Sequence, residues 1–204
     1  MTTSTNINFR KDLIAELTPK LLPFGFQKKG NTFVRETESG LYQVIDFEIG
    51  RSWGSTANHI RIGFGIATEE WIDSLNNWKR PKILSIADCE IRDAYCKLIS
   101  VEDKTTWLPI SNGADIVTAK IQNYILHTVI PYFDKLKTRI EIINMWRHFK
   151  SDMGLLSGRH LLSMGILIYL NQDKVEGEKI LTGLISEKKD NDFFMTAINK
   201  TIGK

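Results

Sequence analysis

Apolar and polar residues alternate along much of Gly25–Ile66, with the period of two that is typical of a half-buried β-strand. Thr32–Glu36 and Leu41–Phe47 are rich in β-branched and aromatic side chains, which favour strands. Gly40 ends the linker between them, where a three-residue hairpin loop needs a residue in the left-handed conformation. His59–Ile66 alternates strictly and predicts a third strand. The region is therefore expected to form a β-meander.

The register of the hairpin decides which side chains face the core. With a three-residue loop, Arg35 lies opposite Gln43 and Phe33 lies opposite Ile45, whereas a four-residue loop would exchange the two faces of the first strand. We prefer the first register, which gives this core face: Phe33, Leu41, Ile45, Phe47 and Ile49, with Ile60, Ile62, Phe64 and Ile66 of the third strand. On the opposite face, Gly63 and Gly65 would allow another backbone segment to approach the sheet.

Most of the remaining chain has the apolar spacing of amphipathic helices. This pattern covers four segments: Phe9–Leu22, Glu69–Trp78, Asp115–Ile130 and Tyr132–Phe149. Pro131 marks a kink or a new helix start, and Lys82–Val101 is ambiguous between a strand with a loop and a short helix. We therefore expect an α+β fold, an antiparallel β-meander sheet of about four strands that is covered on one face by the first and third of these helices.

The C-terminal residues predict a helical extension. His160–Leu170 and Val175–Glu187 have helical spacing, and the small residues Gly165 and Gly177 would let the two helices approach closely. The spacing resembles one tetratricopeptide-like hairpin over residues 160–187, but such a repeat occurs only once, and repeat proteins need about three units to bury a continuous core. We accordingly predict two parts: an α+β domain over residues 1–150 and a helical hairpin over residues 151–204 that packs on it.

A family resemblance lies in the predicted meander. The segments GFQKKGNTFVRE and GLYQVIDFE, followed by a strand that ends in an apolar-Gly-apolar step, resemble the bacterial family known as domain of unknown function 4304 (DUF4304). Asp103–Leu108 and Ile130–Leu136 resemble later landmarks of the family, so the similarity covers Phe9–Leu136, roughly two thirds of the chain. Asp46 and Glu48 depart from the amide and neutral residues expected at their positions. The resemblance implies an α+β domain and carries over no catalytic residue, because none is defined for the family.

Composition narrows the class of protein. Of the 204 residues, 42% are hydrophobic and 25% are charged, which is typical of a globular protein, and the formal net charge is +3. Basic residues are interspersed with acidic ones, so a nucleic acid is a disfavoured partner. The longest apolar runs are far shorter than the roughly 20 residues that span a bilayer, and the first residues lack a signal-peptide pattern. We expect a cytoplasmic protein that does not bind a membrane.

The cysteines and histidines form no recognisable reactive motif. Cys89 and Cys96 are the only cysteines, and they are expected to be reduced structural thiols whose spacing fits no common zinc site. The four histidines, His59, His127, His148 and His160, stand in no metal-binding or triad-like motif. We therefore predict no catalytic residue, no metal and no cofactor.

The side of the meander that faces away from the core carries the most promising group of polar residues. In the preferred register Tyr42, Asp46 and Glu48 share this face, His59 and Arg61 lie across from the two carboxylates, and Trp53 stands at the rim. A solvated sheet face with cross-strand ion pairs is the default for antiparallel sheets. The functional alternative is a shallow recognition surface on which Trp53 is an aromatic anchor.

Two classes of function follow from these residues. The first is a bacterial, cytosolic, non-catalytic protein-interaction module with an unknown protein partner, such as a toxin-neutralising or immunity-type protein. The second is an enzyme or small-ligand-binding domain with an unrecognised polar site on the sheet face. A pocket with carboxylates of raised pKa would favour the second class, and an exposed apolar patch would favour the first.

The predicted C-terminal hairpin is too small to stand alone, so it needs apolar surface from the main domain or from a second copy in a homodimer.

Overall fold

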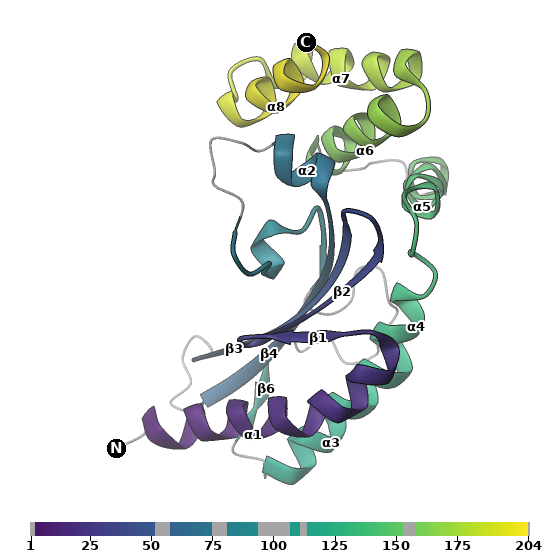
Figure 1. Ribbon diagram of the computed structural model, residues 1–204. Coiled ribbons are helices and arrows are strands. Elements are labelled where there is room, and N and C mark those ends of the chain that lie inside the picture. The colour runs from purple at the N-terminus through teal and green to yellow at the C-terminus, as the bar shows by residue number, and fades with distance from the viewer. Residues whose placement is uncertain are drawn as a thin grey trace. The chain divides into compact units, whose positions relative to one another are not determined.

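The computed structural model describes residues 3–51, 58–74, 81–93, 107–110, 114–152 and 158–203. The chain divides into two units, whose elements are labelled in Figure 1. The sheet unit comprises Met1–Glu36, Tyr42–Ile66 and Ile83–Lys135. The helical unit comprises Thr37–Leu41, Ala67–Lys82 and Leu136–Lys204.

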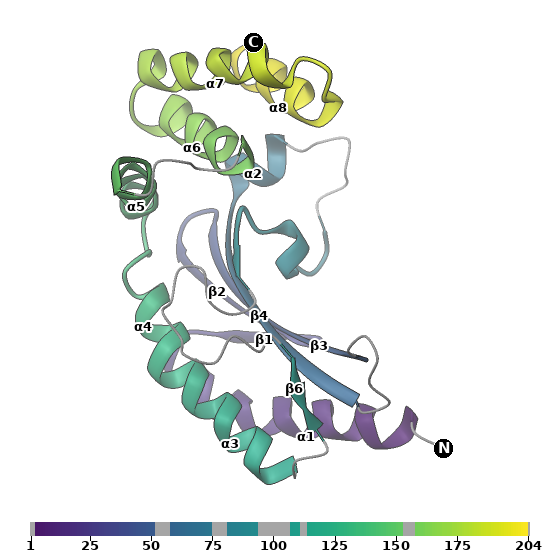
Figure 2. The same ribbon diagram turned by 180° about the vertical axis from the view of Figure 1, so that it is seen from behind.

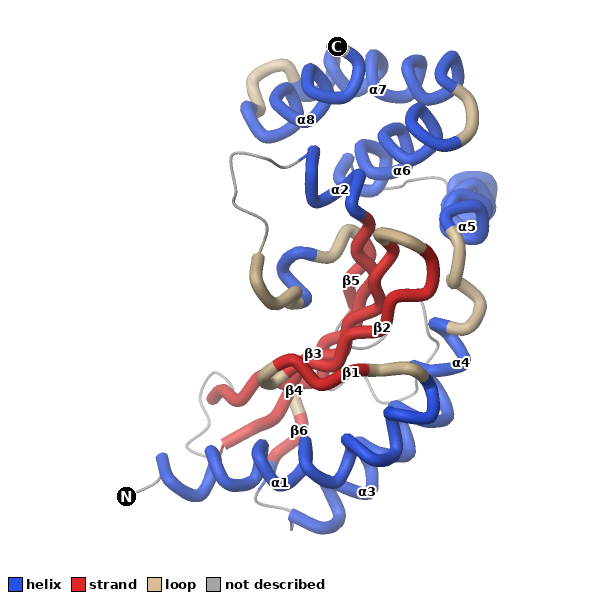
Figure 3. The backbone as a smooth tube through the Cα atoms, in the orientation of Figure 1, coloured by secondary structure: helices blue, strands red, loops and turns tan. Residues whose placement is uncertain are grey.

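An antiparallel sheet confirms the predicted α+β class (Figure 3). Its hydrogen-bonded order across the sheet is β1 (Gln27–Lys29), β2 (Thr32–Glu38), β3 (Leu41–Arg51), β4 (Asn58–Thr68) and β5 (Ile91–Asp93), and β6 (Leu108–Pro109) pairs with β4. The described strands thus outnumber the four that the sequence predicts. The strands whose positions the meander pattern does not predict, β1, β5 and β6, are only two or three residues long, too short to show an alternating pattern.

The hairpin between β2 and β3 has the predicted turn chemistry. Gly40 has a φ of 73°, in the left-handed region that a residue with a Cβ rarely adopts. The Arg35 guanidinium donates a hydrogen bond from Nε to Oε1 of Gln43 at 2.8 Å. This contact is the one expected when the two residues lie opposite each other, and it supports the preferred register.

Arg35 is the centre of a buried polar network in the sheet unit. Besides Gln43, its guanidinium donates to the backbone oxygen of Phe24 and to the carboxylate of Asp134, each at 3.0 Å. It also lies 4.7 Å from the centre of the Phe26 ring. Gln43 in turn donates from Nε2 to a backbone oxygen of α4 at 2.8 Å. The network therefore satisfies polar groups that burial would otherwise leave without partners.

The predicted core face of the sheet is confirmed. Phe47, Ile60, Ile62 and Phe64 are almost fully buried, while Ile49 at the margin is half-buried. Two helices, α1 (Thr3–Leu21) and α3 (Ala114–Tyr124), lie on one side of the sheet in both views (Figure 1, Figure 2). Their apolar stripes supply the other half of the core: Phe9, Leu13, Leu17 and Leu21 from α1, and Val117, Ile121 and Tyr124 from α3.

Pro131 changes the helix geometry, as the sequence predicts. After α3 the chain forms a π-helical turn (Ile125–Val129) and then starts the short α4 (Ile130–Phe133), in which Pro131 occupies one of the first positions. Proline has no N–H to donate and clashes with the carbonyl four residues before it. A wider turn relieves this clash.

The prediction that Tyr132–Phe149 continues as one helix is wrong. Helix α4 ends at Phe133 and α5 begins at Arg139. The new start is fixed by Glu141, whose carboxylate accepts the backbone N–H groups of Lys137 and Thr138 at 2.7 and 2.9 Å. The Thr138 hydroxyl accepts the Glu141 N–H at 3.3 Å in return. This reciprocal pair is a capping box, a helix-start signal that the periodicity argument passed over.

Two further predicted segments are described only in part. The helix expected over Glu69–Trp78 is α2 (Glu69–Ser74) within the described residues. The ambiguous segment Lys82–Val101 contains both alternatives: a 3₁₀ turn, η2 (Ile86–Asp88), and then β5. Residues 75–80 and 94–101 lie outside the described part of the chain.

The helical unit contains the predicted hairpin. Its helices are α6 (Gly158–Asn171) and α7 (Lys174–Lys188), and Asp173 in the linker caps α7 by accepting the N–H groups of Val175 and Glu176. A Cβ added at Gly177 would lie 2.4 Å from the backbone nitrogen of Tyr169, and one at Gly165 would lie 2.8 Å from the Leu181 side chain. The two glycines therefore permit the close helix contact that the sequence predicts.

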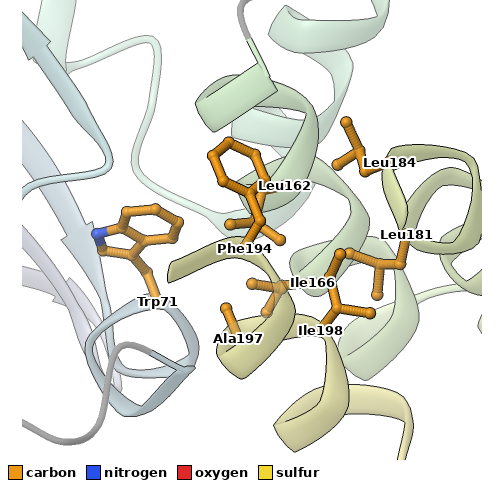
Figure 4. Close-up of a cluster of buried hydrophobic side chains, with 8 residues drawn as sticks. All are labelled: Trp71, Leu162, Ile166, Leu181, Leu184, Phe194, Ala197 and Ile198. Carbon is orange, nitrogen blue, oxygen red and sulfur yellow. The ribbon is translucent and has the colours of Figure 1, made fainter. Parts of the chain in front are cut away.

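A third helix, α8 (Asp192–Ile202), completes this unit and was not predicted. Its side chains join those of α2, α6 and α7 in one apolar cluster (Figure 4): Trp71, Leu162, Ile166, Leu181, Leu184, Phe194, Ala197 and Ile198. The cluster shows that α2, which lies far earlier in the sequence, belongs to the core of the helical unit. This unit starts at Leu136 in the C-terminal part of the chain. The division into an α+β domain over residues 1–150 and a hairpin over residues 151–204 that packs on it stays a prediction.

Candidate functional site

An ion pair on the outer face of the sheet joins two of the residues that the sequence predicts for binding. Glu48 of β3 and Arg61 of β4 lie side by side, with 3.3 Å between the carboxylate oxygen Oε2 and the guanidinium nitrogen. Their side chains are 62% and 36% exposed, respectively. The predicted cross-strand pairing is present, and in water a pair this exposed stabilises the fold by only about 0.2–1 kcal/mol.

Trp107 extends this polar pair into an aromatic surface. The guanidinium of Arg61 lies 5.9 Å from the centre of the Trp107 ring, within the range of a cation–π contact. A Cβ added at Gly50 would lie 2.9 Å from the same ring, so the indole rests directly on the backbone of β3. Trp107 is half-exposed. We call Glu48, Arg61 and Trp107 the Arg–Trp strip.

The part of the outer face near Gly63 and Gly65 is covered, which corrects the expectation of a solvated sheet face there. The segment that contains η2 crosses it: Ile86 lies at Gly63, and Cys89 lies at Gly65, each within 3 Å of where a Cβ would stand. Val44, on the same face, is completely buried. Gly63 and Gly65 therefore do admit another backbone segment, and the Arg–Trp strip beside this segment stays in contact with solvent.

Asp46 fastens the covering segment to the sheet. Its carboxylate accepts the N–H of Phe47 at 2.7 Å and also the backbone N–H of Ile86 in η2. Burial raises the pKa of Asp46 above its ordinary value, and these backbone hydrogen bonds oppose that rise because they favour the charged form. Asp46 is thus turned toward Ile86.

Of the remaining predicted binding residues, His59 lies two residues before Arg61 on β4, and Tyr42 lies at the start of β3, six residues before Glu48. Tyr42 on β3 and His59 on β4 are half-buried, and His59 is paired in register with Pro109 of β6. Trp53 lies outside the described residues. Among the described residues, the tryptophan on this face is Trp107, which stands 46 positions after Arg61 in the sequence. No local periodicity connects two residues so far apart. The one sequence signal for this contact is Gly50, a strand position without a side chain that leaves room for the ring.

A second candidate region, not predicted from the sequence, is a charged hollow of about 320 Å³ in the helical unit. Its walls come from α2, α5, α6 and α8: Glu69, Glu70, Asp73, Ser74, Arg139, Leu170, Lys200 and Thr201. Arg139 forms a two-pronged pair with Glu70, at 2.6 Å from Nε and 2.9 Å from the terminal nitrogen. Asn171 donates to the same carboxylate at 2.9 Å, and Glu38 lies 3.5 Å from the guanidinium.

These contacts hold both members of the pair in their charged forms. Burial alone would raise the pKa of Glu70, but the hydrogen bonds from Arg139 and Asn171 outweigh it and lower the pKa. The hydrogen bond to Glu70 likewise raises the pKa of Arg139. A carboxylate that stays ionised and saturated with donors is suited to joining α2, α5 and α6, and poorly suited to exchanging protons near neutral pH.

Comparison with known proteins identifies the family. Residues 17–135 match the family described as Domain of unknown function (DUF4304), and this match spans more than half of the chain. The chain therefore belongs to this family, as the resemblance of the meander implies. No curated protein and no solved structure matches the chain.

Within the described residues, no cluster of three metal-ligating side chains occurs, and no helix has the length and apolarity to cross a membrane.

Proposed function

We propose that this member of the DUF4304 family is a non-catalytic protein-interaction module whose partner binds at the Arg–Trp strip and at His59, two residues before Arg61 on β4, and extends along β3 toward Tyr42. The observation that carries the proposal is the placement of Arg61. Its side chain is held between a carboxylate at 3.3 Å and an indole ring at 5.9 Å, while about a third of it stays exposed. An arginine fixed in this way is ready to contact a partner.

The chemistry of the strip supports this proposal. Arginine and tryptophan are the residue types that most often carry binding energy in protein interfaces. Arg61 belongs to the paired strand β4, and the Trp107 ring rests on the paired strand β3, so both side chains lose less conformational freedom when a partner binds. The exposed Glu48 carboxylate adds a polar rim to the aromatic and guanidinium groups.

The polar groups of the described residues also favour binding over catalysis. The Asp46 carboxylate is occupied by two backbone N–H groups, and Glu70 is occupied by Arg139 and Asn171. These groups therefore serve the fold. We extend the proposal to a cytoplasmic bacterial protein of the toxin-neutralising or immunity type. This finer form rests on analogy with other small bacterial domains that act only by binding.

The test compares the capture of partners by matched variants. Tagged wild-type chain, Arg61→Ala, Trp107→Ala and the control Lys11→Ala are used to capture proteins from the cell, and any captured protein is purified and titrated by calorimetry. Lys11 is an exposed cation on α1, the helix that covers the opposite face of the sheet. We expect the two strip variants to weaken binding at least about 30-fold, as loss of a hot spot of about 2 kcal/mol would. A partner that binds Arg61→Ala as tightly as the wild type overturns the proposal.

A second candidate function is recognition of a small ligand, or catalysis, at Asp46. The observation that favours it is the raised pKa of this carboxyl, a property shared with many functional acids. Thermal-shift screening of the wild type and Asp46→Asn against a metabolite library distinguishes the two candidates. A compound that stabilises the wild type alone supports a ligand site. Equal responses of both proteins support the structural role of Asp46.

A further inference from the structure

Helix α7 contains a glycine that the fold of a single copy does not explain. Gly177 packs against the backbone of α6, but a Cβ added at Gly183 would have no atom of the described residues within 4 Å. Glycine in a helix interior is less favourable than alanine, because it loses more backbone conformational freedom on folding. The position therefore keeps open space on the helix surface at a cost in stability.

Gly183 lies in an open groove of about 420 Å³ between α6 and α7. The groove has three apolar residues, Leu161, Ile180 and Leu184, and three charged ones, Glu176, Lys179 and Glu187. Along α7 the lining positions recur at intervals of three and four residues, the spacing of a stripe through which two helices pack. Such a stripe with glycine at its centre permits the backbone of a second helix to come close.

We propose that this groove is the contact surface of a symmetric homodimer, in which α7 packs antiparallel to α7 of a second copy with the two-fold axis at Gly183. The argument is one of charge. Lys179 and Glu187 are both exposed and stand four residues before and four residues after Gly183. A two-fold axis at Gly183 therefore places Lys179 opposite Glu187 of the second copy, and Glu187 opposite its Lys179. A parallel pair would instead place like charges together.

The dimensions agree with this arrangement. Four helical residues span about 6 Å, so the two ion pairs lie at roughly that distance on either side of the axis. The axes of packed helices lie about 8–10 Å apart, and the shorter distances occur at small residues. Lysine and glutamate side chains can bridge such a distance. Ile180 of each copy then lies about 4.5 Å along the helix from the axis and adds apolar surface to the contact. Glu176 is already paired with Arg147 of α5, so it does not compete for Lys179.

Sedimentation velocity of the full chain across a wide range of concentrations tests the surface. We expect the wild type to self-associate in the micromolar range and Gly183→Leu to be monomeric, because the added side chain occupies the line of closest approach. The matched control is Thr182→Leu, which adds the same side chain at the neighbouring exposed position of α7, outside the groove. A wild type that stays monomeric up to about millimolar concentration, where associations weaker than about 4 kcal/mol escape detection, overturns the proposal. So does a dimer that Gly183→Leu leaves intact.

Charge exchange tests the antiparallel orientation. Lys179→Glu and Glu187→Lys should each weaken the homodimer at least about tenfold, since each places two like-charged pairs across the axis. Mixing the two single variants should restore association as a heterodimer, and the double variant should dimerise like the wild type, because both arrangements re-form opposite pairs. If the mixture and the double variant are as weak as the single variants, the proposed orientation is wrong. This inference does not depend on the Arg–Trp strip.

Discussion

Two glycines of α7 give opposite expectations for the same substitution. Gly177→Ala adds a Cβ 2.4 Å from the backbone nitrogen and 2.5 Å from the Cα of Tyr169 in α6. Gly183→Ala adds one that has no neighbour within 4 Å in the described part of the chain. Both substitutions gain the helix propensity of alanine, about 1 kcal/mol. Only the first must also separate two packed helices.

The size of this effect can be worked out from the contact distances. Ordinary van der Waals contact of a Cβ begins at 3.4 Å, so α6 and α7 must move apart by about 1 Å (3.4 minus 2.4) to accept a methyl group at Gly177. Overpacking of a core costs about 1–3 kcal/mol. A backbone neighbour cannot rotate away as a side chain can, so we take the upper part of this range, about 2–3 kcal/mol. After subtraction of the propensity gain, we expect Gly177→Ala to destabilise the chain by about 1–2 kcal/mol and Gly183→Ala to stabilise it by about 0.5–1 kcal/mol.

Thermal unfolding followed by far-UV circular dichroism measures both changes. For a chain of this length 1 kcal/mol corresponds to about 2–4 °C. The Tm of Gly177→Ala should therefore fall by roughly 2–8 °C, and that of Gly183→Ala should rise by roughly 1–4 °C. Low protein concentration keeps self-association from contributing to either Tm. Equal Tm values for the two variants would refute the reasoning, because they would show that α6 and α7 do not touch at Gly177.

Three other predictions concern the buried polar groups. Glu70→Gln should cost about 1–3 kcal/mol at neutral pH, since it removes the charge from a hydrogen-bonded pair. Because the pKa of Glu70 is lowered in the folded state, its stabilising contribution is fully present above the unfolded carboxyl pKa of about 4.3 and is lost as the pH falls through the folded pKa. The free energies of unfolding of wild type and variant, measured with urea, should therefore differ at neutral pH and converge in acid. A difference that stays constant with pH would contradict this. Arg35→Lys should destabilise the sheet unit by about 2–3 kcal/mol, because an ammonium group cannot reach all three acceptors of the guanidinium, and an unchanged urea midpoint would show that the network contributes nothing. Burial raises the pKa of the Cys89 thiol well above its ordinary value, so in a Cys96→Ser background a thiol reagent should modify Cys89 only after denaturant is added; rapid modification of the native protein would show that the thiol is accessible.

The local features of the fold were predictable because neighbouring residues encode them. The alternation in Ile60–Ile66 and the left-handed Gly40 depend on strand period and turn stereochemistry, which act over a few residues. The close contact at Gly165 and Gly177 was predictable for the same reason. The capping box of Thr138 and Glu141 was also present in the sequence, yet the apolar periodicity on either side of it concealed the interruption between α4 and α5.

The candidate sites depended on contacts that no local pattern records. Asp46, Glu48 and Arg61 were recognised as residues of one sheet face, but η2, far along the chain, covers the part of that face near Gly63 and Gly65. Trp107 approaches Arg61 across 46 positions, and Glu70 meets Arg139 across 69. Alternation assigns a side chain to one face of a strand. Whether that face contacts water, an indole ring or another segment depends on the free energy of packing the whole chain. Only the tertiary structure shows the result.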